Sequence, residues 1–88
     1  MSYHVRLTPA ALKQLRKMDR FDARIITDWI TDRLEGCDNP RAFGKPLSAN
    51  RAGEWRYRIG KYRVLCIIQD NELIVHVFSI EHRSTVYR

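Results

Sequence analysis

Arginines that alternate with aromatic residues carry the chemistry that this sequence offers. The stretch 53–68 reads GEWRYRIGKYRVLCII. Arg56 and Arg58 alternate with apolar residues, which is typical of a half-buried strand, and Gly60-Lys61 favours a tight turn between two antiparallel strands. This register predicts Arg58 directly opposite Arg63, a like-charge pair that destabilises a sheet but suits an anion. A solvated polar face is the alternative interpretation.

Cations before and after this hairpin extend the candidate site. Because a guanidinium group matches phosphate oxygens with two parallel hydrogen bonds, an arginine-rich strand pair predicts a phosphate-binding sheet face. The polar segment EHRSTVYR at 81–88 is expected beside it, since the last strand returns along the hairpin. The residues expected to bind phosphate or RNA are Lys45, Arg56, Arg58, Lys61 and Arg88.

The sequence contains no metal-ligand motif, no glycine-rich phosphate loop and no nucleophile motif. Phosphate binding and proton transfer remain, and they suffice when the nucleophile is the substrate's own 2′-hydroxyl attacking an RNA 3′-phosphodiester. We therefore expect neither a metal nor another cofactor. His82 is the candidate proton acceptor, because an unperturbed imidazole titrates at about 6.5 whereas arginine stays protonated. A surface histidine is the alternative.

Composition favours a single folded domain with an acidic partner. The chain has 88 residues, 44% of them hydrophobic, and a net charge of +6. Such a charge favours nucleic acid, an acidic protein or an anionic membrane. The membrane is the weakest of these, because the longest apolar run, 64–68, is far below the roughly 20 residues of a spanning helix. Lacking a signal-like N-terminus and a CxxC motif, the chain is expected in the cytoplasm.

The elements that must position these cations follow the order β-α-α-β-β-β. Alternation predicts a strand over 3–7, apolar spacing predicts helices from Thr8-Pro9 and over 21–34, and 37–50 is typical of a loop. The order predicts an α+β fold over 1–88, with two N-terminal helices packed on one face of a curved, mainly antiparallel four-stranded sheet. The position of the first strand in the sheet is left open.

Two further expectations concern register and core. A two-residue turn at Asp70-Asn71 would place Arg63 opposite Phe78 and Leu65 opposite His76. The predicted core consists of Val5, Leu7, Leu12, Leu15, Ile25, Ile26, Trp29, Trp55, Tyr57, Val64, Cys66, Val75 and Val77.

Taken together, five segments resemble toxins of the RelE/ParE superfamily, specifically the RelE and YoeB mRNA interferases. They are the helical pair 12–34, GKPL at 44–47, GEWRYRI at 53–59, YRV at 62–64 and EHRSTVY at 81–87. The resemblance covers nearly the whole chain. It implies a RelE-like fold and a ribosome-dependent endoribonuclease that cuts mRNA in the A site without metal. It also implies a cognate acidic antitoxin, with operator DNA bound only through the toxin–antitoxin complex.

The resemblance also assigns roles by position. Arg63 matches an arginine that contacts the scissile phosphate, and Arg83 matches one assigned to phosphate stabilisation or general acid work. Tyr87 matches the closing aromatic residue, which stacks on or orients substrate; a tether packed on the sheet is the alternative. His82 falls where YoeB-like members place a catalytic histidine.

Two departures from the family pattern leave the proton acceptor open. Arg56 and Arg58 replace two lysines of RelE, one of them a proposed base, and Lys45-Pro46 stands where YoeB-like toxins use a glutamate. A ParE-like inhibitor of DNA gyrase and a non-catalytic antitoxin-binding co-repressor are the rival functions. The set Arg63, Arg83 and Tyr87 favours the endoribonuclease.

Overall fold

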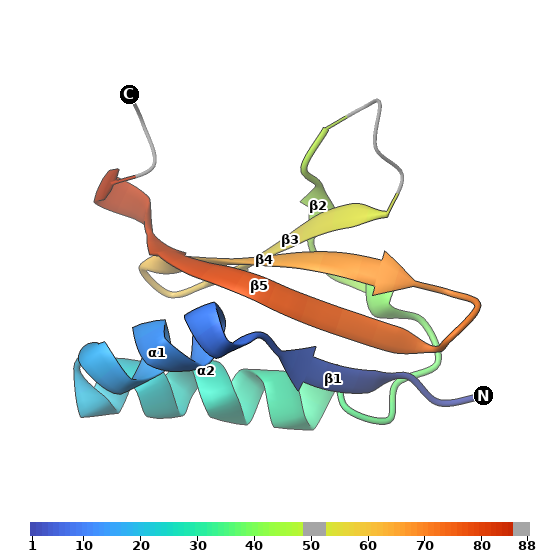
Figure 1. Cartoon of the computed structure of the whole chain (residues 1–88), viewed down its shortest axis with the longest axis horizontal. Coiled ribbons are helices and arrows are strands. Elements are labelled where there is room, and N and C mark those ends of the chain that lie inside the picture. Colours follow the sequence, from blue (N-terminus) through green and yellow to red (C-terminus); the bar gives the residue numbers. More distant parts are fainter. Residues whose placement is uncertain (49–52, 86–88) are drawn as a thin grey trace.

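The chain forms two layers, with both helices on one side of a sheet (Figure 1). This computed structural model describes residues 1–48 and 53–85. Its elements are β1 (His4–Leu7), α1 (Pro9–Lys17), α2 (Arg20–Arg33), η1 (Pro40–Ala42), β2 (Lys45–Pro46), β3 (Glu54–Ile59), β4 (Tyr62–Gln69), β5 (Ile74–His82) and η2 (Arg83–Thr85).

Both helices begin at side-chain caps that the sequence encodes. The Thr8 hydroxyl oxygen accepts the N–H of Ala11 at 3.2 Å, and Pro9 occupies the first turn of α1. An Asp19 carboxylate oxygen accepts the N–H of Asp22 at 3.2 Å at the start of α2. The predicted helical pair is confirmed. No helix in the described ranges combines the length and the apolarity that crossing a bilayer requires.

The sheet has five strands in the order β1-β5-β4-β3-β2, so the α+β class is confirmed but the predicted four strands are too few. The additional strand is β2, which lies inside the segment 37–50 that was expected to be a loop. It pairs antiparallel with Trp55 and Arg56 of β3. It is two residues long and contains Pro46, which only an edge strand tolerates. β1 lies at the opposite edge and runs parallel to β5.

The two hairpins differ in how well their registers were predicted. In the β3–β4 hairpin, Arg58 faces Arg63, Tyr57 faces Val64 and Trp55 faces Cys66, as expected. In the β4–β5 hairpin the prediction is wrong, because Arg63 faces Glu81 and Leu65 faces Ser79. The connection spans 70–73, with Leu73 at φ 56°, and the ladder shifts again at Leu65/Cys66.

The core lies between the helices and the sheet. Most of its predicted members are buried or pack against it, but Leu12 and Ile25 are 40% and 54% exposed. In each case the neighbouring residue faces the sheet: Ala11 is fully buried beside Leu12, and Ile26 is fully buried beside Ile25. The buried apolar side chains are Tyr3, Ala11, Ile26, Ile30, Leu34, Tyr57, Ile59, Val64, Cys66, Ile68, Val75, Val77 and Ile80.

Candidate phosphate-binding site

Four cations gather on the sheet face turned away from the helices. Arg58 is paired with Arg63 across β3 and β4, and Lys45 is paired with Arg56 across β2 and β3. Side chains alternate between the two faces of a strand, so these residues lie opposite the buried Tyr57. We call Lys45, Arg56, Arg58 and Arg63 the arginine face. Two like-charge pairs side by side disfavour the sheet itself, which favours a role in binding an anion.

Arg63 is the most enclosed cation of this face. Its side chain is 9% exposed. Burial lowers its pKa, and the like charges of Arg56, Arg58 and Arg83 lower the pKa further, whereas Glu81 opposes them. Arginine nevertheless stays protonated at neutral pH. A bound phosphate would therefore stabilise a charge that its surroundings disfavour.

Glu81 is a functional candidate that sequence reasoning missed. It pairs with Arg63 and therefore lies on the same side of the sheet. The hydroxyl of Ser79 donates a hydrogen bond to one of its carboxylate oxygens at 3.1 Å. The predicted register put Phe78 opposite Arg63, so the carboxylate was not considered. The only signal in the sequence is its place directly before the HR pair of the tail.

His82 lies on the other side of the sheet from Arg63. Its ring packs edge-on against Tyr62 with centroids 5.1 Å apart, and the Tyr62 hydroxyl donates to Asp22 of α2 at 2.9 Å. Nδ1 of His82 accepts the N–H of Ser84 at 3.1 Å. The expectation that the segment 81–88 lies beside the arginine-rich sheet face is therefore wrong for His82, because adjacent residues of a strand point to opposite faces.

The remaining predicted residues are divided between the site and its surroundings. The backbone N–H of Arg83 donates to the carbonyl oxygen of Lys61 at 2.8 Å, and the charge of Arg83 acts on Arg63. Lys61 lies in the β3–β4 turn, where it borders a shallow hollow with His82 rather than joining the arginine face. Tyr87 and Arg88 lie outside the described residues. Within the described ranges, no group of three or more acidic, cysteine or histidine residues could hold a metal ion.

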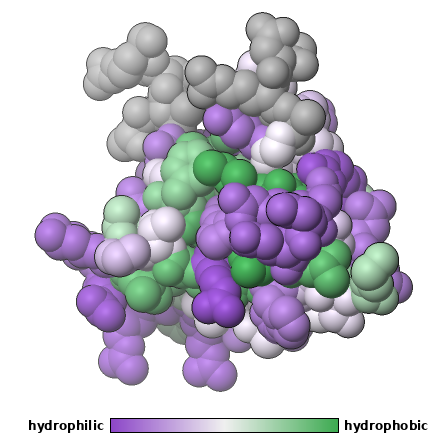
Figure 2. Space-filling model, turned by 45° about the vertical axis from the view of Figure 1, so that its right-hand side comes forward, coloured by the Kyte–Doolittle hydropathy of each residue, from purple (hydrophilic) through white to green (hydrophobic). Residues whose placement is uncertain are grey.

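A cleft of about 350 Å³ reaches both sides of the sheet where β2 ends beside β3, because its lining combines the cations of the arginine face with aromatic residues of the helix side. The surface of the molecule is mixed in character, with hydrophobic surface between hydrophilic side chains on the face turned forward in Figure 2. Trp29, which was expected in the core, and Phe43 of the loop are both half-buried and line the cleft. The lining residues are Trp29, Phe43, Gly44, Lys45, Arg56, Tyr57, Arg58 and Arg63.

Hydrogen bonds from β3 and from the β4–β5 turn hold the loop that carries Lys45. The Tyr57 hydroxyl donates to the carbonyl of Pro40 at 2.7 Å, and the Trp55 indole N–H donates to the carbonyl of Phe43 at 2.6 Å. Arg41 binds both carboxylate oxygens of Asp70, at 2.8 and 3.2 Å. The loop is thereby fixed against the sheet at several points.

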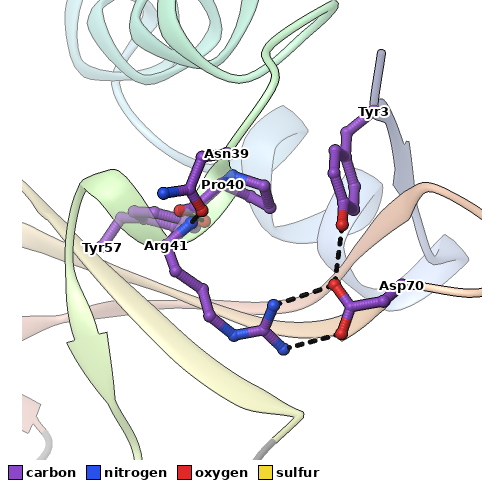
Figure 3. A network of polar contacts seen from close by, with 6 residues as sticks. All are labelled: Tyr3, Asn39, Pro40, Arg41, Tyr57 and Asp70. Carbon is purple, nitrogen blue, oxygen red and sulfur yellow. Dashed lines mark hydrogen bonds and ion pairs between the residues drawn. The ribbon is translucent and has the colours of Figure 1, made fainter. Parts of the chain in front are cut away.

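Asp70 is the centre of the polar network in Figure 3. It accepts a hydrogen bond from the Tyr3 hydroxyl at 2.7 Å in addition to those from Arg41. The hydrogen bonds from Arg41, the larger cause, and from Tyr3 lower the pKa of Asp70. The hydrogen bond between Tyr3 and Asp70 in turn raises the pKa of Tyr3. We call Tyr3, Arg41 and Asp70 the loop anchor. It connects η1, the β4–β5 turn and the residue that precedes β1.

Fold and site together define a small α+β protein whose open sheet face carries a cluster of cations. The family described as the ParE toxin of type II toxin–antitoxin systems, parDE, matches residues 5–87. The chain thus belongs to the RelE/ParE superfamily and is a toxin of a type II toxin–antitoxin system.

Particular relatives lie on the RelE side of this superfamily. Over 88 residues the chain is 32% identical to Toxin RelG of Mycobacterium tuberculosis, covering 100% of this chain and 99% of that protein. It is 33% identical over 86 residues to Toxin RelE of the same organism, covering 98% and 87%.

Solved structures carry the same fold. The toxin–antitoxin complex RelBE2 of M. tuberculosis matches with a TM-score of 0.81 and 30% identity, covering 94% of this chain and 100% of that one. Isolated RelE of Escherichia coli matches with a TM-score of 0.72 and 18% identity, covering 92% and 84%. This second likeness supports the fold alone.

Proposed function

We propose that this toxin is a metal-independent endoribonuclease that cuts mRNA in the ribosomal A site and so inhibits translation. The observation that carries the proposal is the pairing of Arg58 with Arg63 beside Lys45 and Arg56, opposite the carboxylate of Glu81. Cations stabilise the charge that develops on a phosphodiester, and a carboxylate accepts a proton. The named relatives, RelG and RelE, support the RelE side of the superfamily.

The proposed reaction uses the RNA's own 2′-oxygen as nucleophile. That oxygen attacks the adjacent phosphorus while the bond from phosphorus to the 5′-oxygen of the next nucleotide breaks. The products are a 2′,3′-cyclic phosphate and a 5′-hydroxyl, so one proton leaves the 2′-oxygen and one joins the 5′-oxygen. Arg56, Arg58 and Arg63 neutralise the phosphate oxygens, and Arg83 stabilises the phosphate or the leaving oxygen.

Two side chains are candidates for the proton acceptor. Glu81 shares a sheet face with Arg63 and is oriented by Ser79. His82 has the more suitable unperturbed titration range, but it packs on the side of Tyr62 and is bonded to Ser84. A general base must first lie within reach of the proton that it accepts, and its pKa matters only after that. Because Glu81 shares the face of Arg63 and His82 does not, this criterion favours Glu81. Tyr87 remains the proposed stacking residue.

The partners follow from charge and size. A domain of 88 residues with a thin core offers little surface to position RNA, and the ribosome would supply that positioning. The net charge of +6 favours an acidic antitoxin as the inhibitor, and the similar RelBE2 structure is a toxin–antitoxin complex. Binding to operator DNA would then occur only through that complex. Lys45, Arg56, Arg58, Lys61 and Arg88 are the proposed RNA contacts.

Induction in cells with mapping of mRNA 5′ ends tests this proposal. Cuts in phase with codons are expected. Intact mRNA with damaged DNA would instead favour the gyrase inhibitor, which the description of the matching family as ParE makes the second candidate. Intact mRNA and intact DNA, with an antitoxin still bound, would favour a non-catalytic co-repressor.

A further inference from the structure

We infer that the cleft beside the arginine face is a nucleobase subsite, which holds the base of a nucleotide whose phosphate contacts Arg58 and Arg63. The inference deepens the proposed function and rests on it for the identity of the ligand as RNA. A cleft of about 350 Å³ lies at the lower end of the range of about 300–1,000 Å³ found for small-molecule sites. It is large enough for a single base and too small for a folded RNA element.

The wall of the cleft is aromatic. Trp29 and Phe43 lie edge to face with ring centroids 5.8 Å apart, and Trp29 lies 5.3 Å from Tyr57. Trp29 and Phe43 are only half-buried, and both border the cleft. Every base has a π-face that stacks on aromatic side chains, so such a wall suits any base.

One side of this wall is already covered by a cation. The guanidinium carbon of Arg33 lies 5.7 Å from the ring centroid of Trp29 and 5.8 Å from that of Phe43. The Tyr57 hydroxyl is also occupied, because it donates to Pro40. The open surface of the Trp29 and Phe43 rings is the part that lines the cleft, together with Lys45 and the arginines.

The opposite lining is cationic, since Lys45, Arg56, Arg58 and Arg63 border the same cleft. An apolar ring wall and a cluster of guanidinium groups within one cleft match the two parts of a nucleotide, a planar base and a phosphate. Inorganic phosphate would use only the cations, and a neutral aromatic ligand would use only the wall. The combination therefore favours a nucleotide unit of the RNA strand.

The cleft is preorganised by its loop. Gly44 lies on its border at φ +75°, and a Cβ at that position would overlap the carbonyl oxygen of Arg56 and lie 2.8 Å from the ring of Tyr57. The loop is bonded to β3 through Trp55 and Tyr57 on either side of Arg56. A subsite fixed in this way loses little conformational entropy when it binds its ligand.

Binding to the isolated full-length toxin, followed by NMR through the indole N–H of Trp29, tests the subsite. The probes are inorganic phosphate, ribose 5-phosphate, and the 5′-monophosphates of adenosine and uridine. We expect the two nucleotides to bind at least about tenfold tighter than ribose 5-phosphate, because only they offer a ring to stack. Equal affinities for ribose 5-phosphate and the nucleotides would overturn the inference without the need for any variant.

A matched pair of variants locates the ring contact. Phe43→Leu removes an aromatic ring of the wall but keeps an apolar side chain, whereas Phe21→Leu makes the same change where the ring is 79% exposed on α2. We expect Phe43→Leu to abolish the preference for nucleotides and Phe21→Leu to leave it intact. A preference that survives in Phe43→Leu would overturn the assignment of the cleft.

Cleavage on programmed ribosomes separates this inference from the proposed function. If nucleotides bind through Phe43 but mRNA is not cut, the subsite stands and the endoribonuclease proposal fails. If the wild type cuts mRNA and shows no preference for nucleotides over ribose 5-phosphate, the endoribonuclease proposal stands and the subsite is overturned.

Discussion

The two ends of the arginine face are held in place very differently. At the loop end, Lys45 lies on a segment that Tyr57, Trp55 and the loop anchor bond to the sheet, and it pairs with Arg56 of β3. At the tail end, Arg83 is positioned by its N–H bond to Lys61, and the bond between Ser84 and His82 is local. Binding geometry at the loop end is thus coupled to folding stability, whereas substitutions at the tail end should change the chemistry more than the stability.

The largest effect is expected from Glu81 at the tail end. Glu81→Gln keeps the shape of the side chain and its bond with Ser79 but cannot accept the proton, so we expect cleavage to fall about 10²–10⁴-fold. The carboxylate of Glu81 offsets the like charges around the nearly buried Arg63. Stability should therefore fall by about 1 kcal/mol. Single-turnover rates on programmed ribosomes and urea unfolding measure the two quantities.

His82→Gln is the matched variant for this test. It changes the neighbouring residue on the opposite sheet face, and we expect a loss of less than about tenfold, below the usual range for a general base. A loss of 10²-fold or more in His82→Gln, with Glu81→Gln near wild type, would assign the base to the histidine. That result would mean that the tail rearranges when RNA binds.

Arg63→Ala, between the two ends, should have the next largest effect. Removing a preorganised donor to a developing negative charge costs about 10²–10³-fold in rate. RNA affinity should fall too, since this cation contacts phosphate in both the ground state and the transition state. The control is Arg6→Ala, which removes an exposed arginine of β1, where it pairs with His76. Equal effects of the two substitutions would mean that only net charge matters.

Gly44→Ala tests the loop end through stability. A left-handed conformation costs an alanine about 1–2 kcal/mol, and at Gly44 the overlap with the Arg56 carbonyl adds to this. Gly36→Ala is the control, because Gly36 has φ +81° and nothing within 4 Å of an added Cβ. We expect Gly44→Ala to lower the melting temperature by at least about 5 °C more than Gly36→Ala, and to weaken RNA binding. Equal shifts would show that β2 moves away from β3 at little cost.

The sequence predicted one half of the site well because its register follows from simple rules. Alternation in Trp55–Ile59 and a two-residue Gly60-Lys61 turn set every pair of the β3–β4 hairpin. The β4–β5 register depends on a left-handed Leu73 and a shift at Leu65/Cys66, and neither has a signature in residue type. That single error hid Glu81 and placed His82 beside Arg63.

Other features escaped prediction because their residue types fit two roles. Trp29 and Phe43 have the spacing and apolarity of core residues, and nothing in the sequence distinguishes a ring that is covered from a ring that lines a cleft. Lys45-Pro46 has too few residues for a strand pattern, so β2 follows from the tertiary contacts of its loop, which Trp55, Tyr57 and the loop anchor hold in place. Arg41 and Asp70 lie far apart in the chain, and their ion pair depends on the β4–β5 turn.

The smallest expected effect concerns the pH dependence of the loop anchor. Because Arg41 and Tyr3 lower the pKa of Asp70 in the folded state, this carboxylate stabilises the protein above the unfolded value of about 3.9. The contribution is lost as the pH falls through the lower folded pKa. Asp70→Asn should therefore destabilise the toxin at neutral pH, by no more than about 1 kcal/mol because the side chain is 55% exposed.

Urea unfolding of the wild type and Asp70→Asn at pH 7 and at pH 3 measures this difference. We expect it to be present at pH 7 and smaller at pH 3, since protonation removes the same negative charge that the substitution removes. Asp28→Asn is the control, because its carboxylate lies 3.9 Å from Arg24 on the exposed surface of α2 and holds no loop. If the two variants lost equal stability, and mRNA cleavage were unchanged in Asp70→Asn, the loop end would be positioned by Trp55 and Tyr57 alone.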